Sequence, residues 1–136
     1  MADALYLPLR SDSVDGIVSV AVLHHIPNII NRIKFLIECK RILVNKGIII
    51  ATVWSIINIR NLITALIHLL KNYKRTFNEF GDAYISWAGK FNRFYHFLTK
   101  KEIKKLFFRV NLRIVELMQF GSFPNKKNFL IIALKK

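Results

Sequence analysis

An apolar run that ends in two histidines constrains this chain more than any other feature. Residues 15–25 read Asp-Gly-Ile-Val-Ser-Val-Ala-Val-Leu-His-His and follow a turn-like Ser11-Asp12-Ser13. Such a run of small and β-branched residues is typical of a strand buried on both faces, as in a parallel sheet. Ligands of open α/β sheets bind just beyond the carboxyl ends of such strands. His24 and His25 fall at that position, so they are the first candidates for a functional site.

The next segments predict a βαβ unit. Residues 29–44 have helical spacing, and the side predicted to be buried carries Ile30, Ile33, Leu36, Ile37 and Leu43. Gly47 is well placed to end this helix in the left-handed conformation. Residues 48–54 then form a second buried-strand pattern. A strand, a helix and a strand in this order require a right-handed crossover and a parallel sheet.

The second half predicts further helices and a closing hairpin. Residues 56–73 have a helical pattern and residues 77–90 read as a loop, so 55–90 is expected to be a variable insertion. Thr99-Lys100-Lys101-Glu102 is a capping box that opens a helix to about Val110. Residues 112–120 and 128–134 are strand patterns joined by a turn at 122–127, which predicts an antiparallel hairpin. This order within one domain, 1–136, matches the C-terminal half of the class I methyltransferase (Rossmann-like) α/β fold.

The charge of the chain is high and uneven. The net charge is +14 over 136 residues, and residues 55–136 carry +12 of it. A basic half of this kind indicates a polyanionic partner such as nucleic acid, or an anionic membrane surface. The alternative interpretation is a lysine-rich composition that reflects genome bias, with solvated lysines at the surface. The apolar fraction of 53% predicts a packed core rather than disorder.

The single cysteine and the flanks of the apolar segments bear on the compartment. Cys39 cannot form an internal disulfide, and its apolar neighbours predict a buried thiol in a reducing environment. The sequence begins without the basic and apolar regions of a signal peptide. Residues 56–73 are interrupted by Arg60, His68 and Lys71, which makes a membrane span unfavourable and a packing helix preferable to a surface-bound one. These features predict a cytoplasmic or nuclear protein.

Several segments together resemble one family of S-adenosylmethionine-dependent enzymes. The matching residues are Asp3 to Arg10, Asp15 to His25, Arg41-Ile42-Leu43 with Gly47, Val53-Trp54, and Arg93-Phe94-Tyr95-His96. They resemble the tRNA wobble-uridine carboxymethyl methyltransferases, which include the domain fused to AlkB-type dioxygenases. The most specific part is Ala-Val-Leu-His-His at the end of a strand combined with the later Arg-Phe-Tyr-His. The resemblance implies methyl transfer from S-adenosylmethionine to a carboxylate on the modified wobble uridine of tRNA.

The resemblance also implies roles for individual residues. Asp3 looks like the acid that accepts a hydrogen bond from the adenine amino group, with Ala4 and Leu5 beside the ring and Ala21 and Val22 at the cofactor. His24 and His25 would line the floor beside the sulfonium. A carboxylate is already anionic near neutral pH and needs cationic or donor groups rather than a strong base. We therefore expect the catalytic set to be completed by Arg93 as a bidentate fork and by Tyr95 and His96 as donors.

Two geometric expectations accompany these roles. Arg93, Tyr95 and His96 alternate with aromatic residues, so the polar set is expected to share one face of an extended segment. No metal is expected at His24 and His25, because adjacent side chains point in different directions and no cysteine or acid cluster joins them.

The chain departs from the family pattern in ways that predict an incomplete enzyme. No Gly-x-Gly-x-x-Gly sequence occurs, Asn45-Lys46-Gly47 replaces the usual Pro-Gly-Gly, and Asn128-Phe129-Leu130 replaces Asn-Trp-Trp. A truncated gene model or a split gene is the expected origin. The isolated chain is expected to be inactive, not to bind the cofactor at micromolar affinity, and to self-associate through an exposed apolar edge strand.

Two functions from different classes remain open. One is the tRNA methyltransferase, for which a small zinc-binding activator protein is a candidate partner and the lysines of residues 100–105 are a candidate phosphate-contacting face. The other is a non-catalytic basic RNA-binding or scaffold remnant that keeps the second half of the fold.

Overall fold

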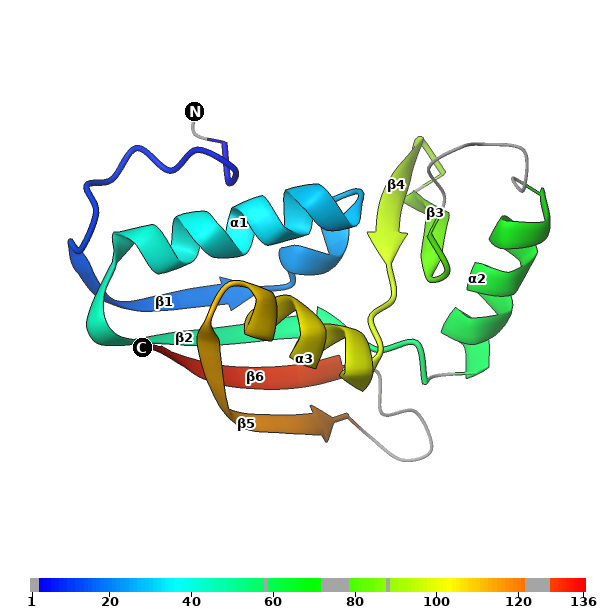
Figure 1. Ribbon diagram of the computed structural model, residues 1–136. Coiled ribbons are helices and arrows are strands. Elements are labelled where there is room, and N and C mark those ends of the chain that lie inside the picture. Colours follow the sequence, from blue (N-terminus) through cyan, green and yellow to red (C-terminus); the bar gives the residue numbers. More distant parts are fainter. Residues whose placement is uncertain (1–2, 58, 72–78, 88, 122–127) are drawn as a thin grey trace.

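The computed structural model describes residues 3–57, 59–71, 79–87, 89–121 and 128–136. Its centre is a four-stranded sheet of order β1-β2-β6-β5, formed by β1 (Val14–Val20), β2 (Leu43–Trp54), β5 (Leu112–Phe120) and β6 (Asn128–Lys135) (Figure 1). β1 and β2 are parallel, and β6 runs antiparallel between β2 and β5. The predicted α/β class, the βαβ unit and the closing hairpin are confirmed. The turn predicted at 122–127 lies outside the described residues.

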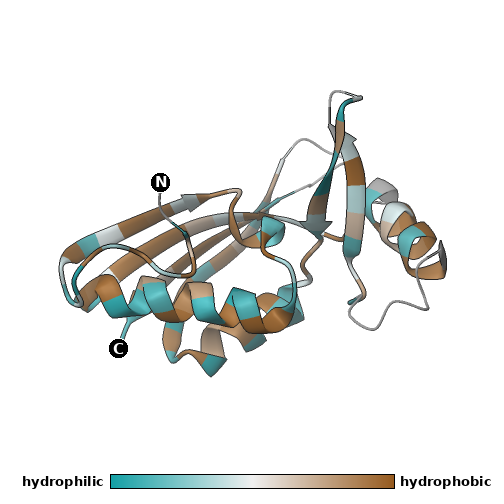
Figure 2. Ribbon diagram, turned by 90° about the horizontal axis from the view of Figure 1, so that it is seen from above, coloured by the Kyte–Doolittle hydropathy of each residue, from teal (hydrophilic) through white to brown (hydrophobic). Residues whose placement is uncertain are grey.

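Two helices cover one face of this sheet. α1 (Ile29–Ile42) and α3 (Lys100–Arg109) lie on the same side in Figure 2. Phe35, Leu36 and Phe107 from these helices pack with Ile49 and Ile131 of the strands in one buried core. The predicted N-cap of α3 is confirmed, because the Thr99 hydroxyl accepts a hydrogen bond from the Glu102 N–H at 3.1 Å. The Glu102 carboxylate, which the capping box would direct to the Thr99 N–H, bonds to His96 Nε2 at 2.7 Å.

The predicted buried side of α1 was wrong in part. Ile30 and Ile37 are 64% and 49% exposed, whereas Arg32 is fully buried. The inward side is rotated relative to the prediction because the buried Arg32 pairs with two partly buried carboxylates, described below, that are distant in sequence. Cys39 is buried, as predicted, and burial raises the pKa of its thiol to about 12, so it stays protonated at neutral pH.

The role predicted for Gly47 was also wrong. α1 ends at Ile42, and the next residue, Leu43, is already extended and begins β2. Lys46, not Gly47, has the left-handed φ of 65°. A Cβ at Gly47 would lie 2.9 Å from the Val44 carbonyl oxygen and 3.2 Å from that of Asp15. Gly47 therefore permits the close approach of β1 and β2 rather than capping the helix.

A smaller unit follows β2 in the chain. It contains α2 (Ile59–Lys71) and the antiparallel pair β3 (Asp82–Trp87) and β4 (Phe91–His96). Residues 77–90 were predicted as a loop, and this prediction was wrong for residues 82–87. The reason is tertiary, because β3 gains its ladder from β4 and packs Ala83 in a small core with Tyr95 and Phe97.

Backbone contacts connect the smaller unit to the main sheet. Leu98 donates its N–H to the Trp54 carbonyl and accepts that of Ile56, both at 3.1 Å. A bridge between Ser55 and Leu98 continues this contact. The chain after β4 is thereby held at the carboxyl end of β2.

The opposite face of the main sheet is apolar and open. Within the described chain β1 pairs only with β2, and Val18 and Val20 are 72% and 65% exposed. The pairing register places Met118 of β5 on the same face, also exposed. The expectation of a strand buried on both faces is thus wrong here, whereas the expected exposed apolar edge is present. No helix in the described ranges is long and apolar enough to cross a bilayer.

Candidate active site

The histidine pair lies just beyond β1, in a short 3₁₀ turn. The strand ends at Val20, and Leu23–His25 form η1, so the histidines do not belong to the strand itself. Ala21 turns the chain with a φ of 57°, and its N–H is bonded to both the backbone carbonyl and the side-chain hydroxyl of Thr52 at 3.1 Å. These bonds hold η1 against the end of β2. The predicted position, at the carboxyl ends of two parallel strands, is confirmed.

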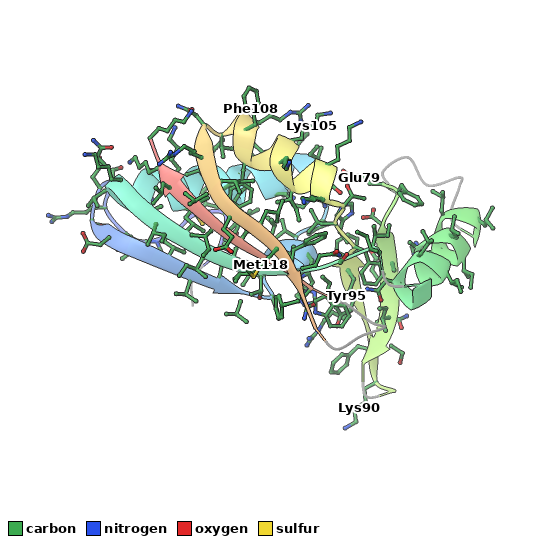
Figure 3. The ribbon with its side chains drawn as sticks, turned by 90° about the horizontal axis from the view of Figure 1, so that it is seen from below. Glu79, Lys90, Tyr95, Lys105, Phe108 and Met118 are labelled. Carbon is green, nitrogen blue, oxygen red and sulfur yellow. The ribbon has the colours of Figure 1, made fainter. Side chains whose placement is uncertain are left out.

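Four rings from three separate elements form an aromatic cluster, namely His24, His25, Trp54 and Tyr95. The His24 ring stacks on Trp54 at 5.5 Å and on Tyr95 at 5.9 Å between centroids. Tyr95 also lies 4.6 Å from His25 and 4.9 Å from Trp54. Figure 3 shows Tyr95 in the region where β4 meets the main sheet. Sequence reasoning assigned no site role to Trp54, although its place at the end of the second parallel strand was a usable signal.

His24 is a buried, neutral donor without an acceptor. The backbone N–H of Trp54 donates to His24 Nδ1 at 3.3 Å, so Nδ1 acts as acceptor and the ring proton belongs on Nε2. Burial, together with the charges of His25 and His96, lowers the pKa of His24 to about 3. Nε2 is buried and has no hydrogen-bond partner within the described structure. An unpaired buried donor costs free energy, and at the carboxyl end of a strand it marks a place for a ligand acceptor atom.

His25 and Arg93 belong to the same region. His25 Nδ1 lies 2.9 Å from the Phe94 carbonyl oxygen, which can only accept, so Nδ1 donates and links η1 to β4. Arg93 is exposed on β4 opposite Ile85 of β3. It stands two residues before Tyr95, so both side chains leave the same face of the strand. The structure thus brings His24, His25 and Tyr95 together, with Arg93 on the same face of β4.

His96 lies on the other face of β4, so the expectation that it shares a face with Tyr95 was wrong. Consecutive strand residues point in opposite directions. The ring nitrogens Nδ1 and Nε2 of His96 are each 2.7 Å from a carboxylate oxygen, of Asp82 and Glu102 respectively. Burial alone would lower the pKa of His96, but the two carboxylates outweigh it and raise this pKa.

The His96 contacts form part of a buried charged network that sequence reasoning missed. Arg32 is fully buried, forms an ion pair with Glu79, lies 3.7 Å from Glu102 and donates to the Ile26 carbonyl at 3.1 Å. Glu79 also accepts the Ile29 N–H at 2.8 Å. The network ties α1 and α3 to the β3–β4 hairpin. Hydrophobic periodicity assigns a charged residue to the exposed side of a helix, so it does not predict that Arg32 is buried.

Three side chains of this network are of the types that bind metal ions. Glu79, Asp82 and His96 place one ligand atom each within 4.8 Å of one another. The Arg32 cation already pairs with Glu79, and His96 already bonds to Asp82. The carboxylates are therefore satisfied by protein groups.

The residues predicted to hold the cofactor come from two segments. The Asp3 carboxylate accepts the Leu5 N–H at 2.9 Å, and Ala4, Leu5 and Val22 pack against the main core. The N-terminal segment passes over α1 in Figure 1. Arg41 holds it there through the carbonyls of Leu7 and Leu9 at 3.0 and 2.8 Å. The assignment of Asp3, Ala4, Leu5, Ala21 and Val22 to the cofactor stays a prediction.

Comparison with known proteins agrees with this architecture. Residues 1–51 match a family model described as a methyltransferase domain. The chain is 27% identical over 131 residues to the tRNA (carboxymethyluridine(34)-5-O)-methyltransferase of Schizosaccharomyces pombe, covering 78% of this chain and 52% of that protein. The chain therefore spans about half the length of this curated relative.

Solved structures show the same fold. An S-adenosylmethionine-dependent methyltransferase from Methanosarcina mazei has a TM-score of 0.78 at 21% identity, covering 98% of this chain and 65% of that one. The 1,6-didemethyltoxoflavin-N1-methyltransferase of Burkholderia thailandensis, solved with S-adenosylhomocysteine, has a TM-score of 0.66 at 13% identity, covering 99% and 49%. The resemblance to S-adenosylmethionine-dependent methyltransferases is confirmed in sequence over residues 1–51 and in fold over nearly the whole chain.

Proposed function

We propose that this chain forms the acceptor-side part of a methyltransferase that esterifies the carboxymethyl group of a wobble uridine in tRNA. The similarity to the fission yeast enzyme supports the substrate class. The structural observation that carries the proposal is the buried Nε2–H of His24, which lacks a partner in the described structure and lies beside Trp54 and Tyr95. A donor of this kind fits an oxygen acceptor such as a substrate carboxylate.

The aromatic cluster also fits the charge of the cofactor. S-adenosylmethionine, when bound, supplies an electrophilic methyl group on a cationic sulfonium. Ring faces attract a cation, and the lowered pKa of His24 keeps its imidazole neutral, so His24 adds no positive charge that would oppose the sulfonium. Asp3, Ala4, Leu5, Ala21 and Val22 are the residues proposed to hold the adenosine side.

The residues around the acceptor act by position and charge. With S-adenosylmethionine bound, a carboxylate oxygen of the uridine would accept the methyl group, the new C–O bond replacing the S–C bond, and no proton would have to move. Arg93 would hold the carboxylate as a bidentate fork, while His24 Nε2–H and the Tyr95 hydroxyl donate to its oxygens. His25 lies beside Tyr95 and holds η1 to β4. His96 becomes a positioning residue, because its ring nitrogens are bonded to Asp82 and Glu102.

A non-catalytic RNA-binding remnant is the second candidate. The cationic surface of α3 favours it. Under either candidate we expect no micromolar binding of S-adenosylmethionine by the isolated chain, which isothermal titration would test. A zinc-binding activator as partner, and a cytoplasmic or nuclear location, are further parts of the methyltransferase proposal.

The decisive experiment supplies the glycine-rich half of the fold and measures methyl transfer to tRNA carrying 5-carboxymethyluridine. Radiolabel from S-adenosylmethionine should enter the tRNA and be released by mild alkali, because a methyl ester hydrolyses and a base methyl group does not. Replacing His24 by Phe should lower kcat by about 100-fold, the usual cost of one lost donor. Lys34→Ala, on the exposed side of α1, is the matched control and should leave the rate unchanged. Alkali-stable label, or full activity in the His24 variant, would refute the proposal.

A further inference from the structure

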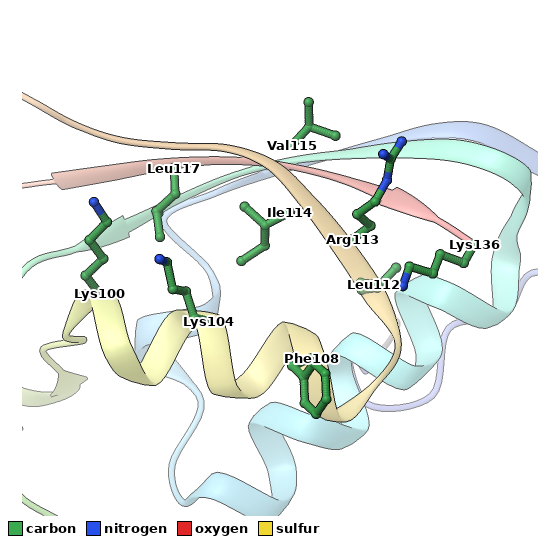
Figure 4. Close-up of a pocket in the computed structure, with 9 residues that line it drawn as sticks. All are labelled: Lys100, Lys104, Phe108, Leu112, Arg113, Ile114, Val115, Leu117 and Lys136. Atoms are coloured by element: carbon green, nitrogen blue, oxygen red, sulfur yellow. The ribbon is translucent and has the colours of Figure 1, made fainter.

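A groove separate from the aromatic cluster runs between α3 and the edge strand β5. It has a volume of about 510 Å³, and Ile114 and Leu117 of β5 contribute apolar lining (Figure 4). Its remaining lining includes Lys100, Lys104, Phe108, Arg113 and Lys136. Basic side chains therefore line a concave surface on the outermost strand of the main sheet.

The charge along α3 is of one sign on its outward side. Its exposed side chains include Lys100, Lys101, Lys104, Lys105 and Arg109. The one acid of the helix, Glu102, turns its carboxylate inward to His96, and its backbone N–H donates to the capping Thr99 hydroxyl. No carboxylate from α3 therefore neutralises these lysines. Glu116 of β5 is exposed but does not line the groove, so the charged side chains of the lining are all cationic and attract a polyanion.

Phe108 lies outside the buried core that α3 forms with the sheet. Its side chain is 84% exposed and points outward, as does Lys105 in Figure 3. The core positions of α3 are filled by Ile103, Leu106 and Phe107, all fully buried. An exposed aromatic ring among cations is the arrangement on which nucleic-acid bases stack while their phosphates bind nearby lysines.

We infer that this groove binds a single-stranded RNA segment, with a base stacked on Phe108 and phosphates at Lys104, Arg113 and Lys136. Binding to an anionic membrane would favour several apolar side chains that insert to the same depth. An acidic peptide would pair with the cations but would not need the exposed Phe108 ring. The Lys100 end of the groove follows Leu98, which bridges to Ser55 beside Trp54. An RNA in the groove thus starts near the strand ends that carry the aromatic cluster. The inference does not depend on methyl transfer.

The test is fluorescence anisotropy of the chain with a labelled ten-nucleotide oligouridylate and no cofactor. Phe108→Ala should weaken binding roughly 5- to 100-fold, the range for loss of one stacked base, while Phe108→Tyr should retain affinity. Lys104→Ala should reduce the slope of log K against log salt by about 0.7, the value for one phosphate of a single strand. Circular dichroism checks that the exposed substitutions leave the fold intact.

Lys34→Ala is the matched charge control, because Lys34 is exposed on α1 and does not line the groove. Equal losses for Lys34→Ala and Lys104→Ala would overturn the inference in favour of general charge attraction. The inference would also be overturned if Phe108→Ala left oligouridylate binding unchanged. A Phe108→Ala variant that lost binding to phosphatidylserine vesicles but kept binding to oligouridylate would overturn it as well. Failure of methyl transfer with intact, Phe108-dependent RNA binding would refute the proposed function and leave this inference standing.

Discussion

Protonation of His24 should destabilise the fold in mild acid. Folding lowers the pKa of His24 from 6.5 to about 3, chiefly through burial. Below pH 6.5 the unfolded chain therefore binds a proton that the folded chain does not, and stability falls by about 1.4 kcal/mol per pH unit. The loss continues until the pH reaches the folded pKa. Between pH 7 and pH 5 this amounts to about 2 kcal/mol.

The assay is urea unfolding at pH 7 and pH 5, followed by tryptophan fluorescence. Trp54 stacks on His24, so its emission reports directly on this region. The wild-type protein should lose about 2 kcal/mol more than His24→Gln over this interval, because glutamine does not titrate. Lys34→Ala, on the exposed side of α1, is the control and should keep the acid-dependent loss of the wild type, because Lys34 stays charged over this interval.

An equal pH dependence of wild type and His24→Gln would refute the reasoning. It would mean that His24 is protonated in the folded state. A histidine proton resonance of His24 that titrates near pH 6.5 would independently lead to the same conclusion. The proposed neutral surface beside the sulfonium would then be untenable.

Three further outcomes are expected. Because the folded state raises the pKa of His96, the stabilisation from its protonated ring is fully present below pH 6.5 and is lost as the pH rises through the folded pKa. In urea titrations at increasing pH, the wild type should therefore lose this stability and His96→Gln should not. Phe107→Ala should cost about 3–5 kcal/mol in urea unfolding, whereas the exposed Phe108→Ala should cost less than about 0.5, and equal costs would contradict the helix orientation. The double change Val18→Lys and Val20→Lys should shift sedimentation of a self-associating chain towards monomer, and an unchanged profile would exclude the β1 edge as the contact.

Local sequence signals predicted the elements whose partners are near in the chain. The strand at 48–54, the hairpin of residues 112–134 and the Thr99 cap follow from apolar patterns and from hydrogen bonds across three residues. β3 was missed because its stability comes from pairing with β4 rather than from its own composition. The orientation of α1 was missed because Arg32 is buried against Glu79, which lies 47 residues later in the sequence.

The candidate site was predictable to the same degree. The position of His24 and His25 followed from the rule for strand ends, and the family resemblance supplied Tyr95. Trp54 joins them only because β1 and β2 are parallel neighbours that end together. The separation of His96 from Tyr95 was predictable from strand parity alone. Its carboxylate partners were not, because they lie on β3 and α3.

The two buried histidines show why β4 can serve both structure and chemistry. His96 is bonded to two carboxylates, which favour its protonated form, whereas His24 has stacked rings and a backbone N–H, which do not. Tyr95 and His96 are adjacent, so the charged network that fixes one face of β4 also fixes the ring on the other. A fixed Tyr95 keeps the rings stacked around the neutral His24 without placing a carboxylate beside it. Under the proposed function, the acceptor carboxylate and the sulfonium would meet with Arg93 as the one permanent charge that the predicted catalytic set contributes.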